Sequence, residues 1–116
     1  MNNFAGVTIE EKMSGKNKVF SIEGDLVIAN ATKVQNEILG KMNGETDVIL
    51  DLREVSHMDC FSIGTIVKIK NELSHNGVLL RVVIKEGHVK EEFDKCRLGD
   101  YLDITIDSRI IEDAAA

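Results

Sequence analysis

Residues that could carry out chemistry cluster in the segment HMDCFSIGTIVKIK, in the middle of the sequence. A cysteine in the first turn of a helix is a candidate nucleophile, because exposed backbone N–H groups and the helix dipole stabilise its thiolate. Cys60 has this place in the pattern, with His57 and Asp59 beside it. A phosphate-binding arginine six positions on is missing, since that residue is Ile66, and no second carboxylate is placed to orient the histidine. We therefore expect a small packed cysteine and no enzymatic activity.

His57 and Cys60 also have the spacing of metal ligands. A closed structural zinc site needs four ligands, however, and His88 and Cys96 lie on another predicted element with nothing to tie them to the first pair. The glycines are scattered singly, and neither of the phosphate-binding patterns GxGxxG and GxxxxGK[ST] is present. We expect neither a metal nor a cofactor.

The cysteine content indicates a reducing compartment. A domain of 116 residues buries enough surface to fold without disulfides. Cys60 and Cys96 fall in separate predicted elements and lack CxxC spacing. We therefore expect two free thiols and a cytoplasmic protein.

Length, charge and hydropathy limit the classes of protein further. The chain fits one domain, residues 1–116, with a core over about 7–107 and a tail at 108–116 that has no packing pattern. The net charge of −6, without any Lys/Arg block, argues against a nucleic-acid partner. No apolar segment approaches the ~20 residues that span a bilayer, so we expect no direct membrane insertion.

The hydrophobic pattern alternates between the periods of strands and helices. Two strands joined at SGKNK open the chain, and Asn30 is a good cap for the helix that follows and ends near Asn43 and Gly44. Strands buried on both faces are expected to alternate with two further helices, the first beginning at Asp59. The order β-β-α-β-α-β-α-β predicts a small α/β sandwich whose mixed, mostly parallel sheet of four to five strands is covered by helices on both faces. The predicted strands lie around 7–9, 18–24, 47–52, 79–84 and 101–107, and the predicted helices at 31–42, 59–76 and 88–96.

The segment VILDLREVSHMDCFSIGTIVKIKNEL resembles the central signature of the STAS domain, a module of bacterial anti-sigma factor antagonists and of sulphate transporter tails. In that family a strand of the type VILDL leads through an Asp-Ser-Ser/Ala-Gly-Leu-Gly turn into the next helix. The resemblance continues upstream through VFSIEGDLVIANATKVQNEI and downstream through GVLLRVVIKEGHVKEEFDKCRLGDYLDI, so it covers about residues 7–107. It implies the same order of strands and helices that the periodicity predicts.

The chain departs from this family pattern where phosphorylation would occur. The resemblance places the acceptor hydroxyl two positions after Asp59, and this residue is Phe61, which has no oxygen to phosphorylate. Ser62 stands where the family has glycine and is the one candidate for a shifted phosphorylation site. Val27 replaces an aspartate that the family often has. We therefore expect the standard serine phosphoswitch to be absent.

The resemblance implies a non-enzymatic interaction module in bacterial signalling and transcription regulation. Its partner would be a protein, such as an anti-sigma factor with serine kinase activity or a related regulator. Docking would use the 59–64 loop and the helix after it, with Asp59 also capping that helix through the N–H of Phe61 or Ser62. Phe61 is either an exposed aromatic anchor or a side chain turned inward beneath the first long helix. The residues expected at the partner surface are Val27, Ile28, Asp59, Cys60, Phe61, Ser62 and Thr65.

Two alternatives use the same segment differently. The chain could be the STAS subunit of a transporter assembly, docking another protein through the same surface. It could also be a redox or thiol protein built on Cys60. The sequence does not decide among these partners or reveal the oligomeric state.

Overall fold

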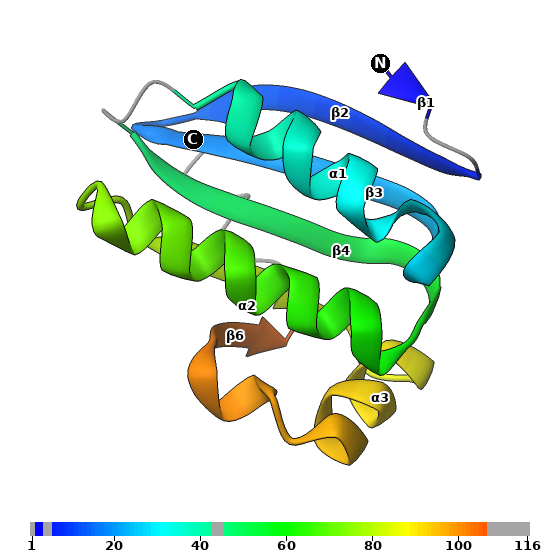
Figure 1. The fold of residues 1–116 in the computed structure, drawn as a ribbon. Helices are drawn as coiled ribbons and strands as arrows, with labels where there is room; N and C mark the ends of the chain where they lie inside the picture. The colour runs from blue at the N-terminus through cyan, green and yellow to red at the C-terminus, as the bar shows by residue number, and fades with distance from the viewer. Residues whose placement is uncertain (1, 4–5, 43–45, 107–116) are drawn as a thin grey trace.

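The computed structural model describes residues 2–3, 6–42 and 46–106. Within these residues it confirms the predicted order of strands and helices and adds a two-residue strand at the N-terminus (Figure 1). The elements are β1 (Asn2–Asn3), β2 (Val7–Ser14), β3 (Asn17–Leu26), α1 (Ile28–Gly40), β4 (Asp47–Met58), α2 (Cys60–His75), β5 (Leu80–Ile84), α3 (His88–Cys96), the 3-10 helix η1 (Gly99–Tyr101) and β6 (Asp103–Ile106).

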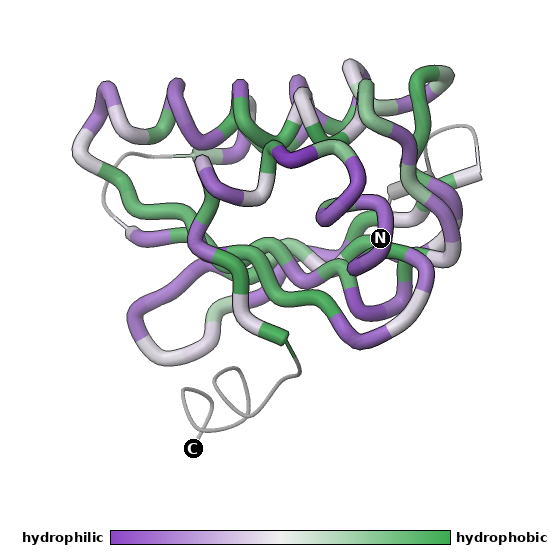
Figure 2. Tube along the Cα trace, turned by 90° about the horizontal axis from the view of Figure 1, so that it is seen from below, coloured by the Kyte–Doolittle hydropathy of each residue, from purple (hydrophilic) through white to green (hydrophobic). Residues whose placement is uncertain are grey.

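The strands of the single sheet are arranged in chain order, from β1 to β6. The β2–β3 hairpin is antiparallel, and β3, β4, β5 and β6 are parallel to one another. Crossovers between parallel strands are almost always right-handed, so three crossovers that step in the same direction place their helices on the same face. All three helices indeed lie on one face (Figures 1 and 2), and the expectation that helices cover both faces was wrong.

The core lies between this helix layer and the sheet. Alternate residues of the central strand β4, Val48, Leu50 and Leu52, are buried with residues of α1, α2 and α3. The intervening Ile49 is buried on the opposite face in a small cluster with Val19 and Val83. Because both faces of β4 are buried there, residues 48–50 are apolar without alternation, as the run VILDL indicated.

Helix α1 begins at Ile28, two residues before the predicted cap. Asn30 is therefore inside the first turn, and its side chain caps the start of the helix from this position. Its Oδ1 accepts a hydrogen bond from the Val27 N–H at 3.0 Å, and its Nδ2 donates to the Asp25 carbonyl at 2.8 Å. The helix ends at Gly40, and the predicted end at residues 43–44 falls outside the described residues.

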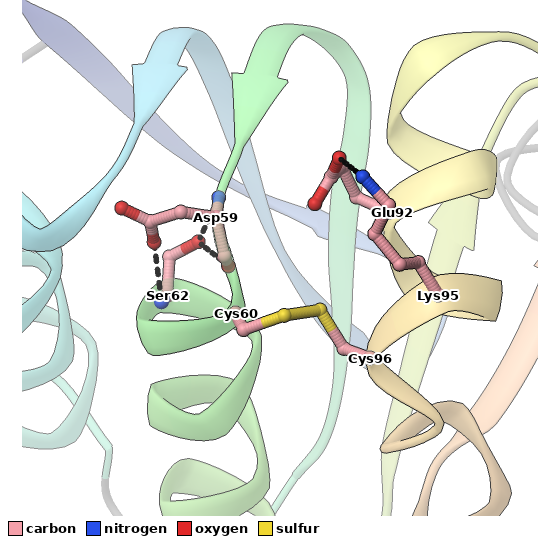
Figure 3. The surroundings of a disulfide bond; sticks show 6 residues. All are labelled: Asp59, Cys60, Ser62, Glu92, Lys95 and Cys96. Carbon is pink, nitrogen blue, oxygen red and sulfur yellow. Dashed lines mark hydrogen bonds and ion pairs between the residues drawn. A yellow bond between two sulfur atoms is a disulfide. The ribbon is translucent and has the colours of Figure 1, made fainter.

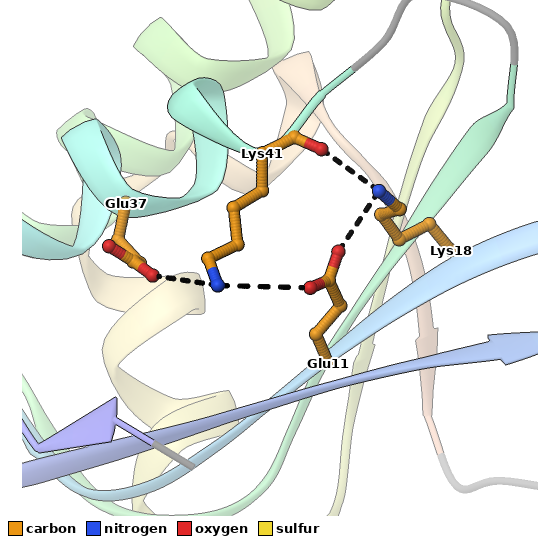
Figure 4. A network of polar contacts seen from close by, with 4 residues as sticks. All are labelled: Glu11, Lys18, Glu37 and Lys41. Carbon is orange, nitrogen blue, oxygen red and sulfur yellow. Dashed lines mark hydrogen bonds and ion pairs between the residues drawn. The ribbon is translucent and has the colours of Figure 1, made fainter.

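Four charged residues join the C-terminal end of α1 to the β2–β3 hairpin (Figure 4). The Lys18 ammonium lies 2.9 Å from a carboxylate oxygen of Glu11 and donates to the Lys41 carbonyl at 2.9 Å. Lys41 in turn pairs with Glu37 at 3.3 Å. The network satisfies a carbonyl group just beyond the helix. The ion pairs lie at the surface with partly exposed side chains, and pairs of this kind each add less than about 1 kcal/mol.

Gly24 occupies a position in β3 that only glycine fits. It pairs with Val7 across the hairpin and has φ 112°, a conformation that other residues rarely adopt. A Cβ atom at this position would overlap with the carbonyl oxygen of Gly6. The glycine thus allows the two backbones to approach closely where β2 begins.

Candidate functional site

The candidate site is the junction between β4 and α2. Strand β4 continues to Met58, six residues beyond the predicted end at residue 52, and α2 begins at Cys60, so Asp59 alone connects them. The segment 59–64, expected to be a loop, is therefore a cap followed by the first turn of a helix. The helix starts this abruptly because the extended Asp59 supplies the N-cap.

The carboxylate of Asp59 binds the N-termini of two helices at once. Oδ1 accepts from the Ser62 N–H of α2 at 2.8 Å, as predicted, and Oδ2 accepts from the Ile28 N–H of α1 at 2.9 Å. The Ser62 hydroxyl completes the cap, since it accepts from the Asp59 N–H at 3.2 Å and donates to the Asp59 carbonyl at 2.8 Å. One negative charge therefore stabilises the positive ends of two helix dipoles and holds them side by side.

We expect Asp59→Ala to lower the free energy of unfolding by about 1–2 kcal/mol, because it removes an N-cap and leaves the Ile28 N–H without its carboxylate. Urea unfolding followed by circular dichroism measures the change. Glu86→Ala, at an exposed acidic position, is the control and should change stability by less than about 0.5 kcal/mol. Equal stability of the two variants would contradict the double-cap interpretation.

Two carboxyl groups make folding stability depend on acid pH. Burial alone would raise the pKa of Asp59, because it disfavours the ionised carboxylate. Hydrogen bonds from Ser62 and Ile28 outweigh this effect of burial, so the pKa of Asp59 is lowered. In β4, burial likewise opposes ionisation of Asp51, whereas hydrogen bonds and the charge of Arg53 hold its pKa below the ordinary value. Arg53 binds Asp51 through Nε at 2.9 Å and Nη2 at 3.0 Å.

Because both folded-state pKa values lie below the unfolded value of about 3.9, these groups contribute their full stability above about pH 5. The contribution decreases as the pH falls through 3.9 toward the folded pKa values. We expect urea midpoints to fall between pH 5 and pH 3, and Asp51→Asn to reduce this dependence. A midpoint that is constant over this range would contradict the assignment.

Apolar side chains are exposed on both sides of Asp59. Ile28, the first residue of α1, is 63% exposed, and Phe61, in the first turn of α2, is 43% exposed. Val27 is half-buried beside Ile28, and Cys60 is exposed. We call these four residues, with Asp59 at their centre, the docking surface, because the sequence predicts that a partner binds there. Phe61 does not turn inward, so the alternative that placed it beneath α1 was wrong.

Ser62 and Thr65 do not belong to this surface. Ser62 is fully buried, and its hydroxyl is engaged with the backbone of Asp59. Thr65 is 5% exposed, and its hydroxyl donates to the Phe61 carbonyl at 3.0 Å. Both residues were expected at the partner surface, but the helix turns them toward the core, because each residue rotates the side chain by ~100°.

Cys60 and Cys96 form a disulfide, and the prediction of two free thiols was wrong (Figure 3). The bond joins the first residue of α2 to the last residue of α3, across 36 positions of sequence, with Cα atoms 5.7 Å apart. Sequence spacing could not reveal this contact, since it depends on how α3 returns to α2. The argument from free thiols to a reducing compartment therefore no longer holds.

The disulfide also changes the chemistry available to the site. His57 does not form a dyad with Cys60, because its Nδ1 lies 3.1 Å from Asp25 Oδ1 and its ring packs edge-on against His88. Glu92, which the sequence gave no reason to select, places a carboxylate oxygen within 4.8 Å of both sulfur atoms. Lys95 pairs with this carboxylate at 3.6 Å (Figure 3).

Comparison with known proteins identifies related folds. The family model described as STAS domain matches residues 8–112, and no curated protein sequence matches the chain. An anti-sigma factor antagonist from Mycobacterium paratuberculosis superposes with a TM-score of 0.78 at 14% identity, covering 93% of this chain and 90% of that chain. The anti-sigma factor antagonist SpoIIAA, in its unphosphorylated form, gives 0.71 at 16% identity and covers 92% of both chains.

A membrane protein contains a similar domain. The murine anion transporter Slc26a9 gives a TM-score of 0.65 at 17% identity, where 90% of this chain matches 18% of the transporter. At these identities the likeness concerns the fold alone. Among the described residues of our chain, no helix is long and apolar enough to cross a membrane.

Proposed function

This chain belongs to the STAS domain family, and we propose that it is a non-enzymatic interaction module of the anti-sigma factor antagonist type. It binds a regulatory protein partner through the docking surface around Asp59. The observation that carries this proposal is the pair of exposed apolar side chains, Ile28 and Phe61, at two helix N-termini that one carboxylate holds together.

The chemistry of the docking surface supports a protein partner. Exposed aromatic and aliphatic side chains that enter pockets of a partner provide most of the binding energy at protein interfaces. Asp59 adds a negative charge between Ile28 and Phe61, and the whole chain carries −6. The complementary surface is therefore an apolar pocket bordered by lysine or arginine, where opposite charges also accelerate association.

The same residues support regulation without the usual phosphoserine. Phosphate at the family position would add a charge of about −1.5 to −2, which the neighbouring Asp59 would repel and which is costly to bury against an apolar pocket. Phe61 occupies that position and cannot be phosphorylated, and the neighbouring Ser62 hydroxyl is buried. We infer that the docking surface stays available or is controlled by other means.

The test is titration of the protein with the purified anti-sigma factor serine kinase from the same genome, followed by intact mass measurement with ATP present. We expect a complex by calorimetry and no change of mass. A gain of about 80 Da on Ser62, the mass of one phosphoryl group, would show that a shifted phosphoswitch operates. Failure to bind this kinase or any related regulator would refute the anti-sigma antagonist function.

A second candidate is the STAS component of a transporter assembly, which the fold likeness to Slc26a9 supports. The docking surface would then bind a cytosolic loop or domain of a membrane protein. Affinity capture from detergent-solubilised membranes, compared with capture from the soluble fraction, separates the two candidates. A transporter recovered with the wild-type chain and lost with a Phe61 variant would favour this second function.

A further inference from the structure

One cysteine of the disulfide, Cys60, belongs to the docking surface and is accessible to other thiols. Cys60 directly follows Asp59 in the chain and is exposed, whereas Cys96 is half-buried. A disulfide that only stabilises a fold is typically buried and resists reduction, whereas exposed disulfides are more often labile or regulatory. Exchange with small thiols is therefore sterically possible at this bond.

The two sulfur atoms lie at helix ends of opposite polarity. Cys60 is the first residue of α2, a helix of 16 residues, where the positive end of the dipole stabilises a thiolate. Cys96 is the last residue of α3, where the negative end of the dipole disfavours one. The Glu92 carboxylate, paired with Lys95 at 3.6 Å, lies within 4.8 Å of both sulfur atoms and does not distinguish them. Cys60 is thus the better leaving group when a thiol attacks the Cys96 sulfur.

The bond fixes the end of α3 to the start of α2. Helix α3 has only nine residues, and its buried residues, Val89 and Phe93, lie in its first two turns. Isolated helices of this length are unstable in water, so the last turn depends on its links to the rest of the protein. Besides the disulfide, Leu98 approaches α2, since a Cβ atom at Gly64 would lie 3.9 Å from its Cδ1. Without the bond, the last turn of α3 and the first turn of α2 lose their covalent connection.

We propose that Cys60 and Cys96 form a reversible redox site that controls the docking surface, with low-molecular-weight thiols as reductants and their disulfides as oxidants. One thiolate attacks Cys96 Sγ, the bond to Cys60 breaks, and Cys60 leaves as a thiolate. A second thiolate attacks the external sulfur of the mixed disulfide and releases Cys96. The protein gains two electrons and two protons, and two thiols become one disulfide; oxidation reverses these steps. In the oxidised form the bond fixes the conformation of the docking surface, and this form binds the partner. The regulation therefore rests on the function proposed above.

The first experiment needs no partner. The full chain is equilibrated with buffers of reduced and oxidised glutathione at varied ratios, and its thiols are counted by alkylation and mass spectrometry. We expect both forms to be populated within the accessible ratios. A bond that stays oxidised at every ratio would overturn the proposal in favour of a purely structural disulfide. A reduced form that takes up Zn²⁺ and then resists oxidation by glutathione disulfide would overturn it in favour of a metal site at Cys60, Glu92 and Cys96.

The second experiment measures amide hydrogen exchange of the oxidised and reduced protein. We expect exchange at Ile28 and Ser62, whose N–H groups bind Asp59, to become about tenfold faster on reduction, with β3 unchanged as the internal reference. The double variant Cys60→Ser/Cys96→Ser should reproduce the reduced form with and without reductant. Equal exchange in both redox forms would overturn the link between the bond and the docking surface.

The third experiment titrates both redox forms with the serine kinase used to test the proposed function. We expect about tenfold weaker binding by the reduced form and by the double serine variant. Equal binding by both forms would overturn redox control while leaving the docking function intact. If neither form binds, the proposed function fails, and the glutathione and exchange results still decide whether the redox site exists.

Discussion

Replacing Gly24 by alanine is expected to lower the free energy of unfolding by about 3 kcal/mol or more. The new Cβ would overlap with the Gly6 carbonyl oxygen, which belongs to the backbone and cannot rotate away. The backbone at φ 112° is also unfavourable for alanine. Strands β2 and β3 must separate to relieve the overlap, and this disturbs the pairing of the antiparallel hairpin within the sheet. Urea unfolding of the variant and the wild type measures the loss.

Gly40→Ala is the matched control for this substitution. Gly40 is the last residue of α1, has no atom within 4 Å of the position of a Cβ, and does not have a positive φ. Alanine should therefore be neutral or stabilise the protein by up to about 1 kcal/mol, because glycine is a poor helix former. If both alanine variants were as stable as the wild type, this result would contradict the inferred close approach of the two backbones at Gly24.

Phe61→Ala is expected to weaken binding of the regulatory partner by about 30-fold or more. Loss of a central aromatic anchor typically costs at least 2 kcal/mol of binding free energy, and each 1.4 kcal/mol corresponds to a factor of ten. Phe61 is 43% exposed in the free protein, so it is available to enter a pocket of the partner. Calorimetric titration with the anti-sigma factor kinase measures the effect, and urea unfolding confirms that the variant is folded.

Leu79→Ala controls for the general loss of exposed apolar surface. Leu79 is 71% exposed and lies beside the start of β4, where its carbonyl accepts from the Val48 N–H at 2.9 Å. Leu79 therefore lies at the opposite end of β4 from the junction at Asp59. We expect its removal to leave the affinity unchanged. If the leucine variant lost as much affinity as the phenylalanine variant, the binding surface would have been assigned to the wrong end of the sheet.

The sequence was informative wherever a short pattern determines the local structure. The apolar run at β4 and the stripe of α2 identified the central strand and its helix, and Asp59 was recognised as the cap of α2. Gly77, with φ 74°, ends that helix as expected of a glycine after a helical C-cap. These features depend on residues close together in the chain, so periodicity and capping rules suffice.

The features that the sequence did not reveal depend on distant segments. The double role of Asp59 needs α1 to begin beside α2, 31 positions away, and the disulfide needs α3 to return to the same junction. The burial of Ser62 depends on how the first turn of α2 packs against the rest of the protein, which neighbouring residues do not determine.

The chain-order arrangement of the sheet has a consequence for biosynthesis. Each parallel strand pairs with the strand that precedes it in the sequence, so a ribosome-bound chain can complete the β2–β3 hairpin and then add β4, β5 and β6 one after another at a single growing edge. No strand has to be inserted between two that already pair. Cys96 is synthesised after β5, so the covalent closure of the α2–α3 junction is among the last steps of maturation.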